Sequence, residues 1–266
     1  MSLPKKVHWS VPIARLGKYI TIGLFRLGEF VQIYLKSFKS IISKTIFWKN
    51  TIVQMELIGI NSLPIVIIIA LFTGMVFSLQ IAKIFATFGL TSQLGQGLTL
   101  AFARELAPVL TGVVVAGRIG SSIAAEIGSM KVTEQVEALE TLSTDPIDYL
   151  VAPRIIAAGL MLPVLVTFAD LIGIAGGVAV ASYYASIPPA DFADGVLTFV
   201  TFWDFVGGLI KAFFFGLIIA GVGTFKGLNT ENGAVGVGKA TTEAVVIATI
   251  IIFIFNYFLS MLLYNL

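Results

Sequence analysis

The sequence has no cysteine, one histidine and few charged residues. Without cysteine there can be no disulfide, no thiolate metal site and no cysteine nucleophile. The one histidine, His8, lies in a polar N-terminal tail, which excludes a histidine-based metal or catalytic site within one chain. Charged residues make up 12% of the 266 residues, whereas soluble domains average about 25%. The chain lacks the polar surface of a soluble enzyme, a nucleic-acid-binding protein or a disordered protein.

Hydrophobic residues, in contrast, make up 57% of the chain, and the mean hydropathy is +0.97. The hydrocarbon core of a bilayer is crossed by a helix of about 20 mostly apolar residues. No alternating ten-residue pattern typical of a membrane β-strand is present. The sequence therefore predicts an all-α integral membrane protein with a five-span domain over residues 57–266. The predicted spans are 57–82, 98–117, 155–183, 205–225 and 244–263.

Residues 1–56 form a segment of a different kind. On a helical projection of residues 11–45, six charged side chains fall within one stripe, and apolar side chains cover the remaining face. This pattern predicts an interfacial amphipathic helix, or two with a break, lying in the plane of the head groups. A further spanning helix is the alternative, which the number of charges disfavours. The stripe consists of Arg15, Lys18, Arg26, Glu29, Lys36 and Lys44.

The basic residues predict the orientation. Nine of the 17 Lys and Arg precede residue 57, and five more flank the loops after the second and fourth spans. Basic residues are enriched in cytoplasmic loops, so the N-terminus is predicted to be cytoplasmic and the C-terminus, five spans later, periplasmic. No pattern typical of a cleavable signal peptide precedes the first span.

The loop between the second and third spans is the most polar part of the five-span domain. Val132, Val136 and Leu139 recur at helical spacing within residues 129–142, and a Thr-Asp-Pro sequence follows. This pattern predicts a short amphipathic helix over 129–142 on the cytoplasmic side.

Residues 233–240, GAVGVGKA, are one residue short of a phosphate-binding Walker A loop. Ala240 stands where the pattern requires the Ser or Thr that binds Mg²⁺, and the segment lies between two membrane spans. We interpret it as a glycine-rich cytoplasmic loop that binds no ATP.

Charged residues within the spans are the sharpest functional signal. An ionised side chain at the bilayer centre costs about 2.5–3.5 kcal/mol even on insertion scales, so it usually faces a partner or a water-filled cavity. Lys211 is the predicted cross-helix partner of Glu105, and Pro108 frees the carbonyl of Arg104 from helical hydrogen bonding. These residues either line a functional cavity or anchor the helices at the outer head groups. Asp170 either binds a proton or cation or bonds to a neighbouring helix.

Residues 104–142, RELAPVLTGVVVAGRIGSSIAAEIGSMKVTEQVEALETL, resemble the signature of the MlaE family, the permease subunits of MCE-type ABC lipid transporters. The likeness continues through TDPIDYLVAPR at 144–154 and GLIKAFFFG around Lys211. It implies a permease that moves phospholipids or related lipids between the inner membrane and a periplasmic MCE protein, in the maintenance of outer-membrane lipid asymmetry. The chain would be a transport subunit without a cofactor, and ATP and Mg²⁺ would bind to a partner ATPase.

The resemblance also implies partners and a location. It implies a homodimer bound to a cytoplasmic ABC ATPase and to a hexameric MCE-domain protein, with a STAS-domain protein in some members and no nucleic acid. The location implied is a bacterial inner membrane, with the chloroplast envelope as the alternative. The direction of transport and the identity of the lipid stay open.

Two sets of site residues follow from the resemblance. The segment 129–142 would be the coupling helix that docks on the ATPase, through Met130, Val132, Thr133, Glu134, Gln135, Val136 and Leu139. A lipid cavity between two permeases would be lined by Arg104, Glu105, Lys211, Leu79, Gln80 and Asn256. Asn256 departs from the family, in which an acidic residue occupies this position.

Two other functions remain open from the residues alone. One is a stand-alone ion-coupled secondary transporter that uses Asp170, Glu105 or Glu126 as a proton-binding carboxylate. The absence of visible inverted repeats disfavours it. The other is a membrane scaffold in which the segment 129–142 recruits a soluble partner.

Overall fold

The computed structural model describes residues 10–42 and 47–264. Every regular element in these ranges is a helix. Five helical segments are long and apolar enough to cross a membrane, which confirms the predicted all-α, five-span fold. The predicted spans are shorter than the observed ones, since the helices continue beyond the apolar core at both ends. The observed segments are Trp48–Thr87, Gln93–Val132, Ile147–Ala185, Phe202–Leu228 and Gly233–Tyr264.

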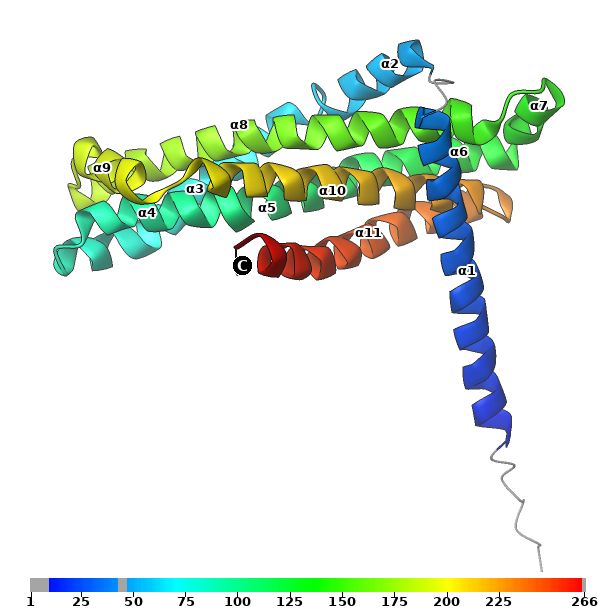
Figure 1. Cartoon of the computed structure of the whole chain (residues 1–266), viewed down its shortest axis with the longest axis horizontal. Coiled ribbons are helices and arrows are strands. Elements are labelled where there is room, and N and C mark those ends of the chain that lie inside the picture. The colour runs from blue at the N-terminus through cyan, green and yellow to red at the C-terminus, as the bar shows by residue number, and fades with distance from the viewer. Residues whose placement is uncertain (1–9, 43–46, 265–266) are drawn as a thin grey trace, which may run out of the picture.

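The helices form an elongated bundle with α9 at one end and α7 at the other, which we call the α9 end and the α7 end (Figure 1). In its middle, α8 packs between α3 and α10, and α10 packs in turn on α6 and α11. The elements, in which η denotes a π-helical turn, are α1 (Ser10–Ile42), α2 (Trp48–Ile58), α3 (Leu63–Thr87), α4 (Thr91–Ala101), η1 (Phe102–Leu106), α5 (Ala107–Val115), η2 (Ala116–Gly120), α6 (Ser121–Val132), α7 (Gln135–Thr141), η3 (Ile147–Val151), α8 (Ala152–Ala185), α9 (Pro189–Phe199), α10 (Phe202–Leu228) and α11 (Gly233–Tyr264).

Close contact between α3 and α8 depends on glycine. A Cβ atom placed on Gly74 would lie 1.9 Å from the carbonyl oxygen of Gly173. Only two glycines allow the backbones to approach this closely, as is typical of helix packing in membranes.

The amphipathic segment forms one continuous helix, α1, over Ser10–Ile42, which agrees with the first of the two predicted alternatives. This helix runs across the long axis of the bundle near the α7 end, and its first half extends away from the other helices (Figure 1). Phe30 packs edge-to-face on Phe225 of α10, and the Tyr34 hydroxyl donates to the carbonyl of Leu217 over 2.6 Å. Helix α1 is not among the described segments that are long and apolar enough to cross a membrane, and its place in the head-group plane stays a prediction. His8 and Lys44 lie outside the described residues, as do the side chains of Arg15, Lys18 and Arg26.

The first span is broken near the α7 end. Helix α2 ends at Ile58, and α3 begins at Leu63 after a turn. Arg118 of η2 binds polar groups at this break. Its Nη1 donates to Ser62 Oγ over 2.7 Å and lies 3.5 Å from the carbonyl oxygen of Leu57. The helical segment therefore begins at Trp48, nine residues before the predicted start of the first span at residue 57, and where it enters the membrane stays a prediction.

The predicted single helix over 129–142 is wrong. Helix α6 ends at Val132, and Glu134 adopts a left-handed conformation with φ 61°, which turns the chain before α7. The predicted apolar stripe is divided as a result. Val136 is buried against the bundle, while the side chain of Val132 is 37% exposed.

Two further segments differ from the predictions. Residues 233–240 form the first turns of α11, so the glycine-rich segment is helical and not a loop. The reversal of the chain between α10 and α11 is instead made by residues 229–232, in which Asn232 has φ 65°. Near the other end of the bundle, the segment between the third and fourth spans contains a helix, α9, that the sequence did not predict.

Candidate functional site

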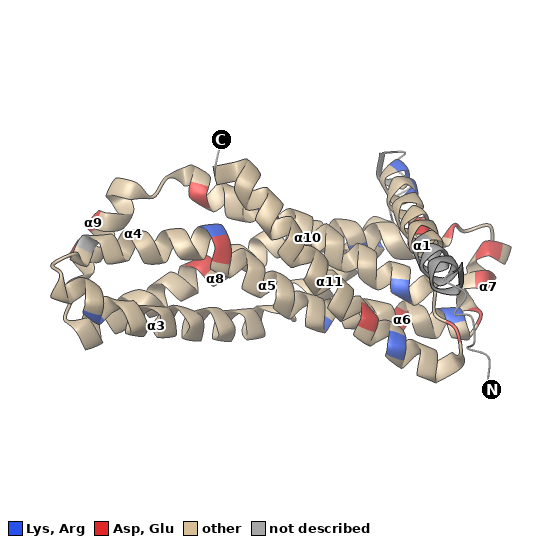
Figure 2. Ribbon diagram, turned by 90° about the horizontal axis from the view of Figure 1, so that it is seen from below, with Lys and Arg blue, Asp and Glu red and all other residues tan. Residues whose placement is uncertain are grey.

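Seven polar side chains from three elements meet inside the bundle, and we call them the buried cluster. Figure 2 shows charged residues concentrated around α1, α6 and α7 and, separately, a group within the bundle. Each cross-helix bond in the cluster joins residues far apart in the sequence. The members are Arg104 and Glu105 of η1, Asp204 and Lys211 of α10, and Asn256, Ser260 and Tyr264 of α11.

Lys211 is the centre of the buried cluster. Its side chain is 0% exposed, and its Nζ lies 2.7 Å from each of three oxygens. These are the carbonyl oxygen of Arg104, Glu105 Oε1 and Ser260 Oγ. An ammonium group has three hydrogens to donate, so Lys211 is fully satisfied without water.

The carboxylate of Glu105 joins Lys211 to helix α11. Its Oε1 accepts from Lys211 and from Ser260 Oγ over 2.7 Å, and its Oε2 accepts from Asn256 Nδ2 over 2.8 Å. The predicted pairing of Lys211 with Glu105 is thereby confirmed. The amide of Asn256 donates to this carboxylate, whereas an acidic side chain at the same place would repel it.

Arg104 pairs with a second carboxylate. Its Nε and Nη2 lie 2.7 and 2.6 Å from Asp204 Oδ1, and its guanidinium lies 4.6 Å from the ring centre of Tyr264. The other carboxylate oxygen, Oδ2, accepts from the backbone N–H and the hydroxyl of Thr201 over 2.7 and 2.9 Å. Asp204 therefore caps the start of α10 and neutralises Arg104 at the same time.

The local backbone explains how one carbonyl becomes available to Lys211. Residues 102–106 form a π-helical turn, η1, and Pro108 follows in the first turn of α5. A proline has no N–H to donate to the carbonyl of Arg104, which accepts from Lys211 instead. Helix α10 can lie this close to η1 because residue 208 is a glycine. A Cβ on Gly208 would lie 2.1 Å from the carbonyl oxygen of Ala103.

The buried cluster is balanced in charge and open on one side. It contains two cations, Arg104 and Lys211, and two anions, Glu105 and Asp204. The side chains of Arg104 and Glu105 are 37% and 41% exposed, whereas those of Lys211 and Asp204 are 0% and 3% exposed. One face of the cluster can therefore hydrogen-bond a polar group while the inner charges hold three helices together.

The other predicted cavity residues lie elsewhere in the single chain. Leu79 and Gln80 are exposed on α3, which packs mainly on α8 and α4, away from the cluster. Their role as cavity lining stays a prediction. Asp170 of α8 is 3% exposed, and its Oδ1 has no hydrogen-bond partner among the described residues. The described residues thus provide no partner for this oxygen, and the role of Asp170 stays open.

The predicted coupling residues lie on the α6–α7 turn at the α7 end. An ion pair between Lys131 and Glu137 bridges the break between these helices, and this hydrogen bond holds the pKa of Glu137 below its ordinary value. Gln135 Nε2 donates to Thr133 Oγ1 over 3.0 Å, and Glu134 is exposed. A protruding turn with exposed polar groups is suited to contact another protein. The role of these residues in coupling stays a prediction.

Sequence reasoning missed Asp204, Ser260 and Tyr264. A signal for each was present. Asp204 stands three residues after Thr201 at the start of an apolar run, which is the pattern of a capping box. Asn256, Ser260 and Tyr264 are four residues apart, so a helix places them in one polar stripe on an otherwise apolar segment.

The residues that the structure describes contain no group of three or more His, Cys, Asp and Glu side chains that could hold a metal ion. The contacts between opposite charges within the buried cluster are hydrogen-bonded ion pairs. An all-α protein with five spans and a balanced polar cluster inside the bundle has the features of a membrane transport protein.

Comparisons with known proteins give the family. A sequence profile of the family described as Permease MlaE matches residues 51–262. A probable ABC transporter permease protein of Synechocystis is 50% identical over 217 residues, which cover 82% of each chain. A second one, from Rickettsia typhi, is 42% identical over 245 residues, covering 92% of this chain and 93% of the relative. The chain belongs to the MlaE family of ABC transporter permeases.

A plant relative has a more specific name. The Arabidopsis thaliana chloroplastic protein TRIGALACTOSYLDIACYLGLYCEROL 1 is 40% identical over 244 residues, covering 92% of this chain and 69% of that protein. The name of that relative contains the name of a lipid.

Proposed function

We propose that this permease moves phospholipids or related lipids, as the membrane-spanning subunit of an ATP-driven transporter. The exposed side of the buried cluster, formed by Arg104 and Glu105 within an apolar bundle, is the main support for this substrate class. A guanidinium group binds phosphate well, and apolar helix surfaces suit acyl chains. The lipid in the name of the plant relative supports the same substrate class.

The chain works with partners in this proposal. A cytoplasmic ATPase binds ATP and Mg²⁺ and docks on the α6–α7 turn. Two copies of the permease form a cavity that opens toward a hexameric MCE-domain protein on the periplasmic side, and some assemblies include a STAS-domain protein. Leu79, Gln80 and Asn256 contribute to the lining of that cavity.

The proposed orientation places the α7 end in the cytoplasm of a bacterium, and the C-terminus in the periplasm. Lys131 and Lys226 are near the ends of α6 and α10, and Lys239 is in the first turns of α11. These helix ends lie toward the α7 end in Figure 1, whereas Asp191 and Asp194 belong to α9. This distribution is the one expected when basic residues mark the cytoplasmic side of an inner membrane.

The proposal is tested by reconstitution of the permease with its ATPase in liposomes that contain a fluorescent phospholipid. We expect lipid movement that requires ATP and that stops when ATP is replaced by a non-hydrolysable analogue. Lipid movement by the permease alone, driven by a proton gradient and lost in Asp170→Asn, would instead identify the stand-alone ion-coupled carrier. In the ATP-driven mechanism, the proton gradient has no effect on the rate.

A further inference from the structure

A second polar site lies at the α7 end, between α2, α6 and the start of α8. Its cavity has a volume of about 300 Å³. It is lined by Asn50, Val53 and Gln54 of α2, Glu126 of α6, and Tyr149 and Arg154 of the η3–α8 segment. It is separate from the buried cluster, which is built from η1, α10 and α11.

Arg154 is the main cation of this cavity, and its side chain is only 4% exposed. Its Nη1 donates to the carbonyl of Leu150 over 2.7 Å, and its Nη2 lies 2.8 Å from Glu126 Oε1. Its Nε is buried and has no hydrogen-bond partner among the described residues. A buried donor without a partner is costly, so this N–H has a strong need for an acceptor from a ligand.

Glu126 supplies the opposite charge. Its side chain is 51% exposed, and Arg154 is its one ion-pair partner in the described ranges. One of its oxygens is therefore available to a cationic group that enters the cavity. Asn50, Gln54 and Tyr149 add neutral amide and hydroxyl groups to the wall. The cavity thus presents one buried cation and one accessible anion side by side.

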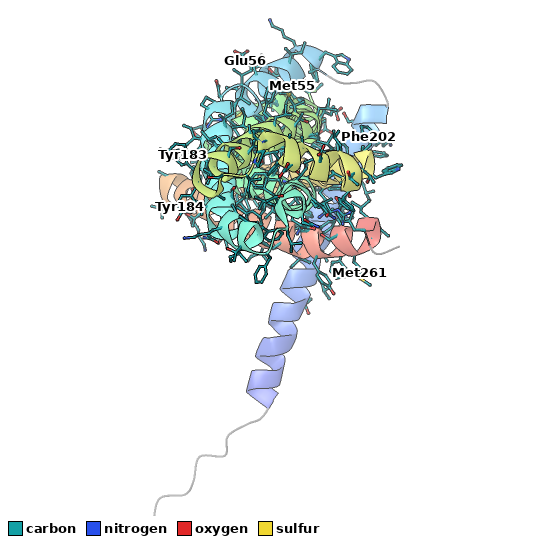
Figure 3. All side chains as sticks on the ribbon, turned by 90° about the vertical axis from the view of Figure 1, so that its left-hand side faces the viewer. Met55, Glu56, Tyr183, Tyr184, Phe202 and Met261 are labelled. Carbon is teal, nitrogen blue, oxygen red and sulfur yellow. The ribbon has the colours of Figure 1, made fainter. Side chains whose placement is uncertain are left out.

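The position of the cavity fits the head-group layer of a membrane. Helix α2 begins with Trp48 and Lys49, which are residue types that mark the membrane–water interface. From there, exposed apolar side chains run along the outer face of α2, including Ile52 at 62% exposure. Figure 3 shows α2 at the edge of the bundle, where Glu56 is exposed while Met55 packs against the core. A lipid can place its chains along α2 with its head group in the cavity.

We infer that this cavity binds the head group of a zwitterionic phospholipid that carries a phosphate and a primary ammonium, such as phosphatidylethanolamine. The phosphate accepts from Arg154 Nε and from the amides of Asn50 and Gln54, and the ammonium donates to Glu126. A phospholipid with a neutral glycerol head group offers no cation to the second oxygen of Glu126, which Arg154 does not reach, and brings an uncompensated negative charge beside this carboxylate. The inference needs only a bilayer and is independent of the proposed transport activity.

The test measures lipid retained by the purified full chain, without an ATPase, in native mass spectrometry. The chain is exchanged into mixed micelles with equal amounts of phosphatidylethanolamine and phosphatidylglycerol. We expect the wild type to retain the ethanolamine lipid with about tenfold preference, which Glu126→Gln abolishes. Glu56→Gln is the matched control on the exposed side of α2, and we expect it to keep the preference. Arg154 is left unchanged because it also holds the carbonyl of Leu150.

A cavity-filling variant and a competition experiment complete the test. Val53→Trp fills the cavity without touching the ion pair, and we expect it to reduce retention of both lipids. Soluble glycerophosphoethanolamine at the lipid concentration is expected to displace little of the bound lipid, because it lacks the chains that lie on α2. An unchanged preference in Glu126→Gln, unchanged retention in Val53→Trp, or full displacement by the soluble head group would each overturn the inference.

Discussion

The buried cluster and the ion pairs at the α7 end use the same residue types in different ways. In the cluster, Lys211 is 0% exposed, and all its donors are used by groups on η1 and α11. At the α7 end, the Lys131–Glu137 pair joins residues six apart in sequence, and both side chains are more than one-third exposed. The first arrangement connects distant helices, and the second only steadies a turn.

The two arrangements differ in how much they contribute to the stability of the bundle. Breaking a buried pair strands an ion in an apolar environment, whereas breaking an exposed pair leaves two solvated ions. The cluster should therefore govern the attachment of α11 and the stability of the whole fold. The α6–α7 turn should be able to change its contacts at little cost, as its proposed docking to an ATPase would require.

The largest effect is expected from Glu105→Gln. This change leaves the buried ammonium of Lys211 without a carboxylate, and we expect a loss of about 3–5 kcal/mol in the free energy of unfolding. Unfolding by SDS in mixed micelles measures it. The double variant Glu105→Gln/Lys211→Met removes both charges and should recover most of the loss. Losses that simply add in the double variant would show that the two residues are not coupled.

Burial also decides which residue of the cluster a test of transport can change. Because Lys211 bonds three groups on two other elements, its removal affects the fold as well. Functional tests of the cluster need a change that leaves the partner hydrogen-bonded. Arg104→Gln suits this purpose, because Thr201 still donates twice to Asp204 Oδ2 and the glutamine amide has N–H groups to offer to Oδ1.

A smaller effect is expected where α10 meets η1. Gly208→Ala places a methyl group against the carbonyl of Ala103, and we expect a loss of about 1–3 kcal/mol as the helices separate. Gly97→Ala is the control, because nothing lies within 4 Å of its added methyl group. The same unfolding measurement compares them. Equal stability of the two variants would contradict the close contact on which the cluster depends.

Two substitutions of Tyr264 distinguish the contribution of its ring contacts from that of its hydroxyl hydrogen bond. Its ring lies under Arg104 and Lys211, at 4.6 and 5.0 Å from its centre, while its hydroxyl makes only a long bond of 3.4 Å to the carbonyl of Asp204. We expect Tyr264→Leu to cost about 1 kcal/mol and Tyr264→Phe clearly less, because phenylalanine keeps the cation–π contacts. A larger loss in the phenylalanine variant would assign the main role to the hydroxyl.

The smallest effect is expected from Glu137→Gln. We expect no measurable change in global unfolding, and roughly a few-fold faster hydrogen exchange of the amides in α7. Since the pKa of Glu137 is lowered in the fold, its contribution is present above its ordinary pKa of 4.5 and lost as the pH falls below that value. Acidification should therefore speed exchange in the wild type but not in Glu137→Gln. Glu140→Gln, on the same turn, is the control.

The sequence predicted those features that depend on composition and on scarce residue types. Five apolar runs predicted five spans, and the rarity of charge within spans predicted the pairing of Lys211 with Glu105. The break at Glu134 was missed because it depends on a left-handed backbone conformation at an ordinary residue. The π-helical turn at 102–106 and the break before α3 were missed because Lys211 and Arg118, distant in sequence, stabilise them.

Arg104→Gln is the sharpest test of the proposal that the exposed side of the buried cluster contacts the lipid. The measurement is ATP-dependent movement of fluorescent phospholipid by the reconstituted transporter, compared with Lys83→Gln, which removes an exposed cation of α3 outside the cluster. We expect Arg104→Gln to lower the rate about tenfold while folding and ATPase binding persist, and Lys83→Gln to equal the wild type. Wild-type lipid movement by Arg104→Gln would show that the exposed side of the cluster does not contact the lipid.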